Sequence, residues 1–203
     1  MTTERTITND ARRAQIVKAA IEVLAESGYP GATFTRITQH AGLRSPRMIS
    51  YHFADKAELI QQVAVEVISA GARAILARIE HETAAVPRLR GYLEANLRFL
   101  WEHPREIAAL SAVGPYLRKP EGTHYTSQSA REFSVLNLEG MLADGQRTGE
   151  FRSFDLRAVA VMIRGAIDAA ADQFHGDPPL DLDAYTRTVV DTFTRAVTAE
   201  EPT

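Results

Sequence analysis

Hydrogen-bond donors cluster between residues 44 and 56, and they are of the types that nucleic acids attract. Arginine and lysine neutralise phosphates, and arginine, serine, tyrosine and histidine can also reach base edges in a DNA major groove. The candidates in this segment are Arg44, Ser45, Arg47, Ser50, Tyr51, His52 and Lys56. Their types and spacing predict a surface that contacts double-stranded DNA.

Two short helices would position these donors. The first follows Thr33 as its N-cap, and the second opens at Ser45, with Pro46 in its first turn, and runs to about Phe53. Their lengths and the tight glycine-containing turn between them are typical of a helix-turn-helix at about residues 33–53.

The apolar residues of the two helices predict which face stays free. Phe34 and Ile37 of the first helix must pack against Met48 and Ile49 of the second. The opposite face of the second helix is then left in solvent, where a DNA groove could receive it. A helical corner with no function has the same pattern, so the motif alone leaves both interpretations open.

Two helix starts could each hold a phosphate, because a helix N-terminus carries free N–H groups and a partial positive charge. The first is the start after Thr33, where Thr35 and Arg36 add donors. The second is the start of the next, long helix at Lys56.

Residues around this motif resemble a known family. The segments GYPGATFTRITQHAGL, SYHF and DKAEL resemble the N-terminal DNA-binding domain of the tetracycline-repressor (TetR) family of bacterial transcription regulators. The resemblance runs from about Ala14 to Leu43 and from Ile49 to Leu59, roughly a quarter of the chain. Between these parts, LRSPRM is one residue longer than the commoner family pattern, so the second helix can begin at a different residue here.

The resemblance implies roles for single residues. By it, Tyr51 and His52 lie at the end of the recognition helix that contacts the DNA backbone and neighbouring bases, and Lys56 binds a phosphate. It also implies a C-terminal region that binds a small-molecule effector, and a homodimer whose last two helices form a four-helix bundle across a two-fold axis. Such a dimer is what a pseudo-palindromic operator requires. We therefore expect a repressor that an effector releases from DNA.

The whole chain predicts an all-α protein of about nine helices, because apolar residues recur at spacings of three and four and Pro or Gly marks the breaks. We expect a helix-turn-helix domain at residues 1–55 and an effector-binding and dimerisation domain at residues 56–203. Asn9 or Asp10 would cap the first helix, and Asp55 with Glu58 has the pattern of a capping box for the fourth. The helices are expected at about residues 10–27, 34–41, 45–53, 56–82, 88–102, 105–113, 126–147, 155–175 and 182–199.

An effector pocket would need an apolar wall with a few polar groups. Two helices carry such a mixture on faces predicted to point inward, although an ordinary core gives the same pattern. These candidates are Tyr92, Asn96, Phe99, Phe133, Asn137 and Met141. Small and apolar residues of the last two helices predict the dimer contact, namely Gly165, Ala166, Ala169, Val189 and Phe193.

Composition and motifs exclude several classes of protein. The 203 residues include no cysteine, which excludes disulfide frameworks, iron–sulfur centres and cysteine nucleophiles. Common hydrolase, nucleotide-binding and metalloprotease motifs are missing, so we expect no catalytic residue, no metal and no cofactor. Two rival interpretations remain open. One is a helical protein that sequesters a small molecule. The other is a metal-dependent helical-bundle enzyme, for which Asp168, Asp172 and His175 share a helix face.

Charge and hydropathy predict the surroundings of the protein. Residues 1–60 contain eight Lys and Arg against six Asp and Glu, whereas the whole chain has a net charge of −3. The basic excess at this end is compatible with an anionic partner. The polar N-terminus has no signal-peptide pattern, and no apolar run approaches the roughly 20 residues of a membrane-spanning helix. We therefore expect a cytoplasmic protein with no membrane partner.

Overall fold

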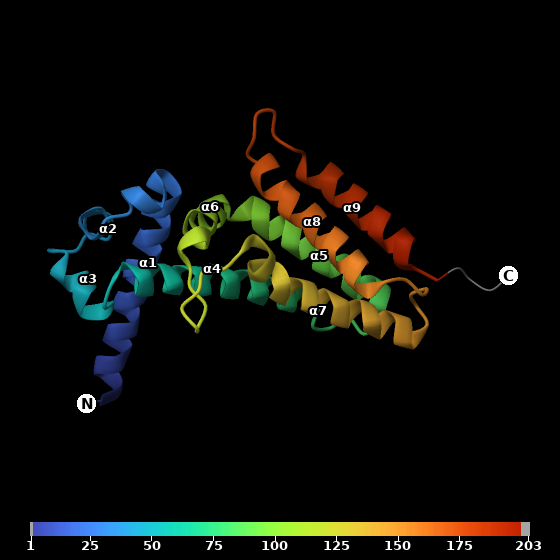
Figure 1. Ribbon diagram of the computed structural model, residues 1–203, viewed down its shortest axis with the longest axis horizontal. Coiled ribbons are helices and arrows are strands. Elements are labelled where there is room, and N and C mark those ends of the chain that lie inside the picture. The colour runs from blue at the N-terminus through green and yellow to red at the C-terminus, as the bar shows by residue number, and fades with distance from the viewer. Residues whose placement is uncertain (1, 200–203) are drawn as a thin grey trace. The chain divides into compact units, whose positions relative to one another are not determined.

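The computed structural model describes the backbone of residues 2–199 and the side chains of residues 9–126 and 129–199. Within this part of the chain it contains nine α-helices and one short 3-10 helix, in the order that Figure 1 shows. They are α1 (Thr2–Gly31), α2 (Phe34–His40), α3 (Arg47–His52), α4 (Lys56–Ile79), α5 (Ala85–Glu102), α6 (Pro104–Val113), η1 (Gly114–Tyr116), α7 (Ser127–Thr148), α8 (Leu156–Gln173) and α9 (Leu182–Val197). The prediction of an all-α fold is confirmed.

The chain divides into two compact units. Unit 1 comprises the residues up to Ser69 together with Arg105–Thr126, and unit 2 comprises Ala70–Pro104 together with the residues from Ser127 onward. The segment Arg105–Thr126 joins unit 1 because Ala109, Val113 and Leu117 are buried in the same apolar core as α1. The predicted functional division at residue 55 stays a prediction.

The core of unit 1 is built on the inner face of α1. Ile16 and Ala20 on this face are fully buried, and Ile37 of α2 and Ile49 of α3 pack into the same cluster. Burying one such isoleucine side chain contributes roughly 1.5–3 kcal/mol. Because helices of six or seven residues are unstable alone, this packing is what holds α2 and α3 in place.

Two helix limits at the N-terminal end differ from the prediction. The backbone of α1 is helical from Thr2, so neither Asn9 nor Asp10 caps it. The helix expected to end at about residue 27 continues to Gly31, with a kink at Gly28, whose φ of 64° is left-handed.

The core of unit 2 lies among α5, α7, α8 and α9, where Leu93, Leu138 and Ile163 are fully buried. The Glu150 carboxylate accepts the N–H of Ala85 at 2.9 and 3.0 Å, which caps the start of α5. This hydrogen bond lowers the pKa of Glu150 below its ordinary value. The turn after α7 is thereby tied to α5.

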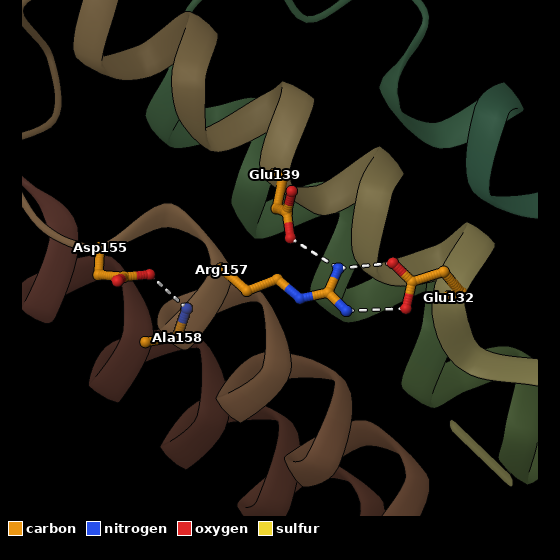
Figure 2. Close-up of polar contacts among 5 residues, drawn as sticks. All are labelled: Glu132, Glu139, Asp155, Arg157 and Ala158. Carbon is orange, nitrogen blue, oxygen red and sulfur yellow. Dashed lines mark hydrogen bonds and ion pairs between the residues drawn. The ribbon is translucent and has the colours of Figure 1, made fainter. Parts of the chain in front are cut away.

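Charged side chains join α7 to α8 on the surface of unit 2. Figure 2 shows Arg157 of α8 between two carboxylates of α7. Its guanidinium donates to Glu132 at 2.7 and 2.8 Å and to Glu139 at 2.9 Å. Asp155 caps α8 by accepting the N–H of Ala158 at 2.8 Å. These contacts keep α7 and α8 side by side.

α4 corrects the expectation about hydropathy. Among the described residues, α4 is the one helix that is long enough and apolar enough to cross a membrane, judged by length and composition alone. Its most apolar stretch has a mean hydropathy of 1.4. However, its first half supplies Leu59, Ile60 and Val63 to the core of unit 1. A core helix of a soluble protein passes the same test, so α4 is weak evidence for a membrane span.

Candidate nucleic-acid interface

Residues 34–52 of unit 1 form the predicted helix-turn-helix. The Thr33 hydroxyl caps α2 by accepting the N–H of Arg36 at 3.2 Å. The chain then turns at Gly42, whose φ of 64° lies in the left-handed region that favours glycine. Ile49 is fully buried, so α3 is anchored through this side chain and turns its opposite face to solvent.

The start of α3 differs from the prediction. The sequence predicted a helix that opens at Ser45 with Pro46 in its first turn, but Pro46 stands at the N-cap position and no side chain caps the helix. The Met48 N–H instead donates to the backbone carbonyl of Ser45 at 3.1 Å. Pro46, with φ of −57°, already has the backbone angle that a helix needs. Arg47 is the first residue of α3, and its side chain is exposed.

Most of the predicted DNA-contacting side chains are exposed on unit 1. Tyr51 has 79% of its surface in solvent, which is unusual for so large a ring. The other exposed members are Thr33, Thr35, Arg36, Arg44, Arg47 and Ser50, whereas Ser45, His52 and Lys56 are half-buried. The free side of α3 therefore presents guanidinium and hydroxyl donors, which suit phosphate and base contacts.

Arg13 of α1 holds the C-terminal end of α3, a role that the sequence did not indicate. Its guanidinium donates to the main-chain carbonyl of His52 and lies 4.2 Å from the ring centre of Phe53. It also donates to Glu58 at 3.2 Å. Because Arg13 is 39 residues from His52 in sequence, no local pattern could have signalled the contact.

The surroundings of His52 favour a neutral imidazole near neutral pH. Burial lowers its pKa below the ordinary value of 6.5, and the charges of Arg13 and Arg12 lower it further. The ring of Tyr51 meets the imidazole edge-on, with 5.1 Å between ring centres. The lowered pKa therefore favours the neutral imidazole, which contacts the ring of Tyr51.

The predicted cap of α4 is present. The Asp55 carboxylate accepts the N–H of Glu58 at 2.8 Å, and the Glu58 carboxylate accepts the N–H of Ala54 at 2.7 Å. The bond from Ala54 lowers the pKa of Glu58, and Arg13 lowers it further. These bonds fix the direction in which α4 leaves α3.

Lys56, the expected phosphate ligand, is held against the C-terminal end of α1. Its ammonium donates to the backbone carbonyl of Tyr29 at 2.6 Å and lies 3.8 Å from the centre of the Tyr29 ring. Burial lowers the pKa of Lys56. Tyr29 was missed by the sequence reasoning, although it lies inside the segment that carries the family resemblance.

The candidate effector residues of unit 2 fall into two groups. Tyr92, Asn96 and Phe99 of α5 and Met141 of α7 are buried, as expected of an inward face. The predicted inward orientation is wrong for the other two candidates, which lie on α7. Phe133 is 70% exposed and Asn137 is also exposed, because Val135 and Leu138 occupy the inward positions of this helix.

An open hollow of about 440 Å³ lies on unit 2 among α4, α5 and α9. Phe99 is the predicted effector residue that lines it, and the ring of His103 lies 4.4 Å from that of Phe99. The rest of its lining mixes charged and small residues: Ala74, Arg78, Glu94, Ala95, Arg98, Glu102, Leu182, Asp183, Thr186 and Arg187.

A partly buried polar cluster joins α5, α7 and α8. Arg164 donates to Asp168 at 2.8 Å and to the Asn96 side chain at 3.3 Å, and Arg131 pairs with the same Asp168 at 2.8 Å. Burial raises the pKa of the neighbouring Tyr92. Because two guanidinium groups already compensate the Asp168 carboxylate, its contacts are those of an ion-pair network.

The predicted dimer residues are also divided. On α8, Gly165 and Ala169 are exposed, whereas Ala166 is half-buried and its carbonyl accepts the Tyr185 hydroxyl at 2.6 Å. On α9, Val189 is buried and Phe193 packs against the same core of unit 2. Val189 therefore faces inward, whereas Phe193 is only partly buried.

Comparisons with known proteins agree with this geometry. Residues 16–63 match the family described as bacterial regulatory proteins, tetR family. Over 179 residues the chain is 26% identical to the HTH-type transcriptional activator FasR of Mycolicibacterium smegmatis. The aligned region covers 86% of this chain and 78% of that protein. Over 107 residues it is 34% identical to the HTH-type transcriptional repressor AcnR of Corynebacterium glutamicum. That aligned region covers 52% of this chain and 54% of AcnR.

Solved structures share the fold over nearly the whole chain. A bacterial regulatory protein of the tetR family from Rhodococcus superposes with a TM-score of 0.77 at 23% identity, covering 94% of this chain and 98% of that one. AibR, solved in complex with isovaleryl coenzyme A and operator DNA, superposes with a TM-score of 0.70 at 16% identity, covering 89% and 97%. At these identities the likeness shows the fold.

Proposed function

Because the chain belongs to the tetR family of bacterial regulatory proteins, we propose that it is a homodimeric transcriptional repressor that binds a pseudo-palindromic operator and is released by a small-molecule effector. The observation that supports this most directly is the free face of α3. Arg47 and Tyr51 are exposed there, while Ile49 on the opposite side is fully buried. A helix held in this way can enter a major groove.

The exposed donors divide into two roles. Arg47, in the first turn of α3, is the residue we assign to a guanine edge, since a bidentate arginine contact gives about 1–3 kcal/mol of discrimination between bases. Arg36, Arg44 and Lys56 are assigned to phosphates, which fix the register of the protein on the duplex.

Retardation of DNA from the region upstream of the coding sequence tests this function. We expect specific binding that weakens steeply with salt, with a log–log slope of roughly −7 if each subunit makes about four charged phosphate contacts. Arg47→Ala should lose specificity, whereas Arg147→Ala, the same change at an exposed position of unit 2, should leave binding unchanged. Equal affinity for unrelated DNA would contradict the proposal.

We place the dimer contact on α7 and α8. Phe133 and Leu136 of α7 and Val161 and Met162 of α8 are large apolar residues with 50–70% of their surface exposed. The helices that carry them lie side by side, joined by Arg157 (Figure 2). Exposed apolar patches on soluble proteins mark interaction sites, and a palindromic operator calls for a second copy of the chain.

Two substitutions that introduce a charge distinguish this dimer contact from one on α9. Met162→Glu would put an unpaired charge into the contact, so light scattering should report a monomer at micromolar concentration. Thr188→Glu, at an exposed position of α9, should remain a dimer. Dissociation by Thr188→Glu and not by Met162→Glu would move the contact to α9.

The effector site is proposed for unit 2, at the hollow beside Phe99. The hollow offers an aromatic ring and several charged groups, which suits a small molecule with an apolar part and a charged group. AibR, which shares this fold, was solved with both an acyl coenzyme A and operator DNA. The one tryptophan of the chain, Trp101 on α5, is 45% exposed and provides a fluorescence signal.

A panel of metabolites screened by Trp101 fluorescence and by release of bound DNA tests the effector site. A compound that does both should lose its effect in Phe99→Ala. An effect that survives this substitution would place the site elsewhere. Transcription in vitro then decides the sign of regulation, since FasR is named an activator and AcnR a repressor.

We propose that the protein acts in the cytoplasm by binding and not by catalysis. An effector must bind one of two conformations more tightly in order to shift DNA affinity. A sequestering protein would bind the small molecule and no DNA, and a metal-dependent enzyme would purify with bound metal. DNA retardation together with metal analysis therefore separates all three interpretations.

A further inference from the structure

A tyrosine outside the helix-turn-helix reaches the phosphate-binding candidate through another aromatic ring. Tyr116, the last residue of η1, stacks on Tyr29 with 3.6 Å between ring centres and 17° between ring planes. Both residues belong to unit 1. Tyr29 in turn contacts Lys56 twice, through its backbone carbonyl at 2.6 Å and through its ring at 3.8 Å.

The position of Tyr116 is fixed by its neighbours. Val113 and Leu117, on either side of η1, are buried in the core of unit 1. Arg105, at the start of α6, forms an ion pair with Glu22 of α1. The backbone therefore delivers the Tyr116 ring to Tyr29 as part of a packed segment, and the contact does not depend on a long flexible side chain.

The contacts of Lys56 leave it able to bind one more group. An ammonium has three N–H donors. The Tyr29 carbonyl accepts one of them, and the negative face of the Tyr29 ring attracts the positive charge. A lysine side chain that is already held in place loses less freedom when it binds a phosphate than one that moves in solvent.

We propose that Tyr116 is a positioning residue for DNA binding, which clamps Tyr29 and thereby holds the Lys56 ammonium where a DNA phosphate can reach it. This rests on the proposed DNA-binding function. It gives residues 114–116, about 60 positions beyond Lys56 in the sequence, a part in operator affinity.

A double-mutant cycle tests the proposal. Tyr116→Ala should weaken specific and non-specific DNA alike by about 3–10-fold and lower the magnitude of the salt slope by about one per subunit, as expected for one lost phosphate contact. Tyr116→Phe keeps the stacked ring and should bind like the wild type. Lys56→Ala should show the same loss, and adding Tyr116→Ala to it should cause no further loss.

Two further variants separate positioning from folding. Tyr116→Leu keeps apolar bulk in the same place and should still lose affinity, because leucine cannot stack on Tyr29. Tyr125→Ala removes another aromatic ring from the same segment. Because the Tyr125 ring contacts Lys119, at 5.9 Å, this variant should leave the salt slope unchanged. Each variant is compared with the wild type by its helix content and thermal midpoint.

A measurement without DNA keeps the proposal distinct from the function on which it rests. In the wild type the Lys56 side-chain protons next to the ammonium should show an upfield NMR shift from the Tyr29 ring, and Tyr116→Ala should reduce this shift. A wild type that binds no DNA would contradict the proposed function, while the shift still tests the clamp. Unchanged affinity and slope in Tyr116→Ala, or a double mutant that loses the product of the two single effects, would overturn the proposal.

Discussion

Arg13 makes three contacts that converge on the junction of α3 and α4, and its loss should loosen α3. Arg13→Met keeps much of the apolar stem and removes the guanidinium. A charged hydrogen bond to a carbonyl contributes about 1.5–3 kcal/mol, and the contact with the Phe53 ring roughly 0.5–1 kcal/mol. The pair with Glu58 adds little, because its side chains are 30% and 43% exposed. Since these values are not additive, we expect a loss of about 2 kcal/mol.

Amide hydrogen exchange measures this loss locally. The Phe53 N–H donates to the Ile49 carbonyl at 2.9 Å at the end of α3. A loss of about 2 kcal/mol should speed its exchange roughly 30-fold. The control is Arg12→Met, since Arg12 forms a surface hydrogen bond with Gln15. An acceleration below about threefold in Arg13→Met, or an equal acceleration in Arg12→Met, would refute the reasoning.

Three further predictions concern specificity, pH and packing. Arg47→Ala should lose preference at one base position per half-site, whereas Arg44→Ala should weaken binding to all DNA sequences about equally. Binding to operator variants tests both, and the reverse result would exchange the base-contact and phosphate-contact roles of the two arginines. Burial lowers the pKa of His52 in the folded protein below its ordinary value of 6.5, so the contribution of this imidazole to the stability of unit 1 is complete above about pH 6.5 and is lost as the pH falls below it. His52→Gln should flatten this dependence in urea titrations at about pH 7.5 and 5.5; an unchanged dependence would assign it to other groups. Gly145→Ala in α7 would bring a Cβ within 2.1 Å of the Phe151 ring and should lower the thermal midpoint, whereas Gly140→Ala, with no atom within 4 Å, should raise it; equal shifts would contradict the packing.

The parts of the fold set by local signals were predictable from sequence. The cap by Thr33, the left-handed Gly42 and the capping pattern of Asp55 and Glu58 depend on residues within a few positions of each other. Each is a short-range hydrogen bond or backbone preference that the residue type reveals. The exception is Ser45, where the extra residue before α3 leaves proline at the N-cap.

Contacts between distant residues were not predictable. Nothing near Tyr29 in the sequence indicates that Tyr116 stacks on it, and Arg13 meets His52 only after α1, α3 and α4 have packed. For Phe133 and Val189, periodicity showed that a helix has an apolar face without showing what covers it. The structure turns Phe133 outward and Val189 into the core of unit 2.

Selection of bound fragments from genomic DNA, followed by hydroxyl-radical footprinting of the enriched site, tests the central claim most directly. If two copies of the exposed α3 face read DNA, the enriched sequence should be a pseudo-palindrome protected in two half-sites related by a two-fold axis. Protection should disappear when Arg47 and Tyr51 are both replaced by alanine. Enrichment of no common sequence, or a protected site without two-fold symmetry, would contradict the account.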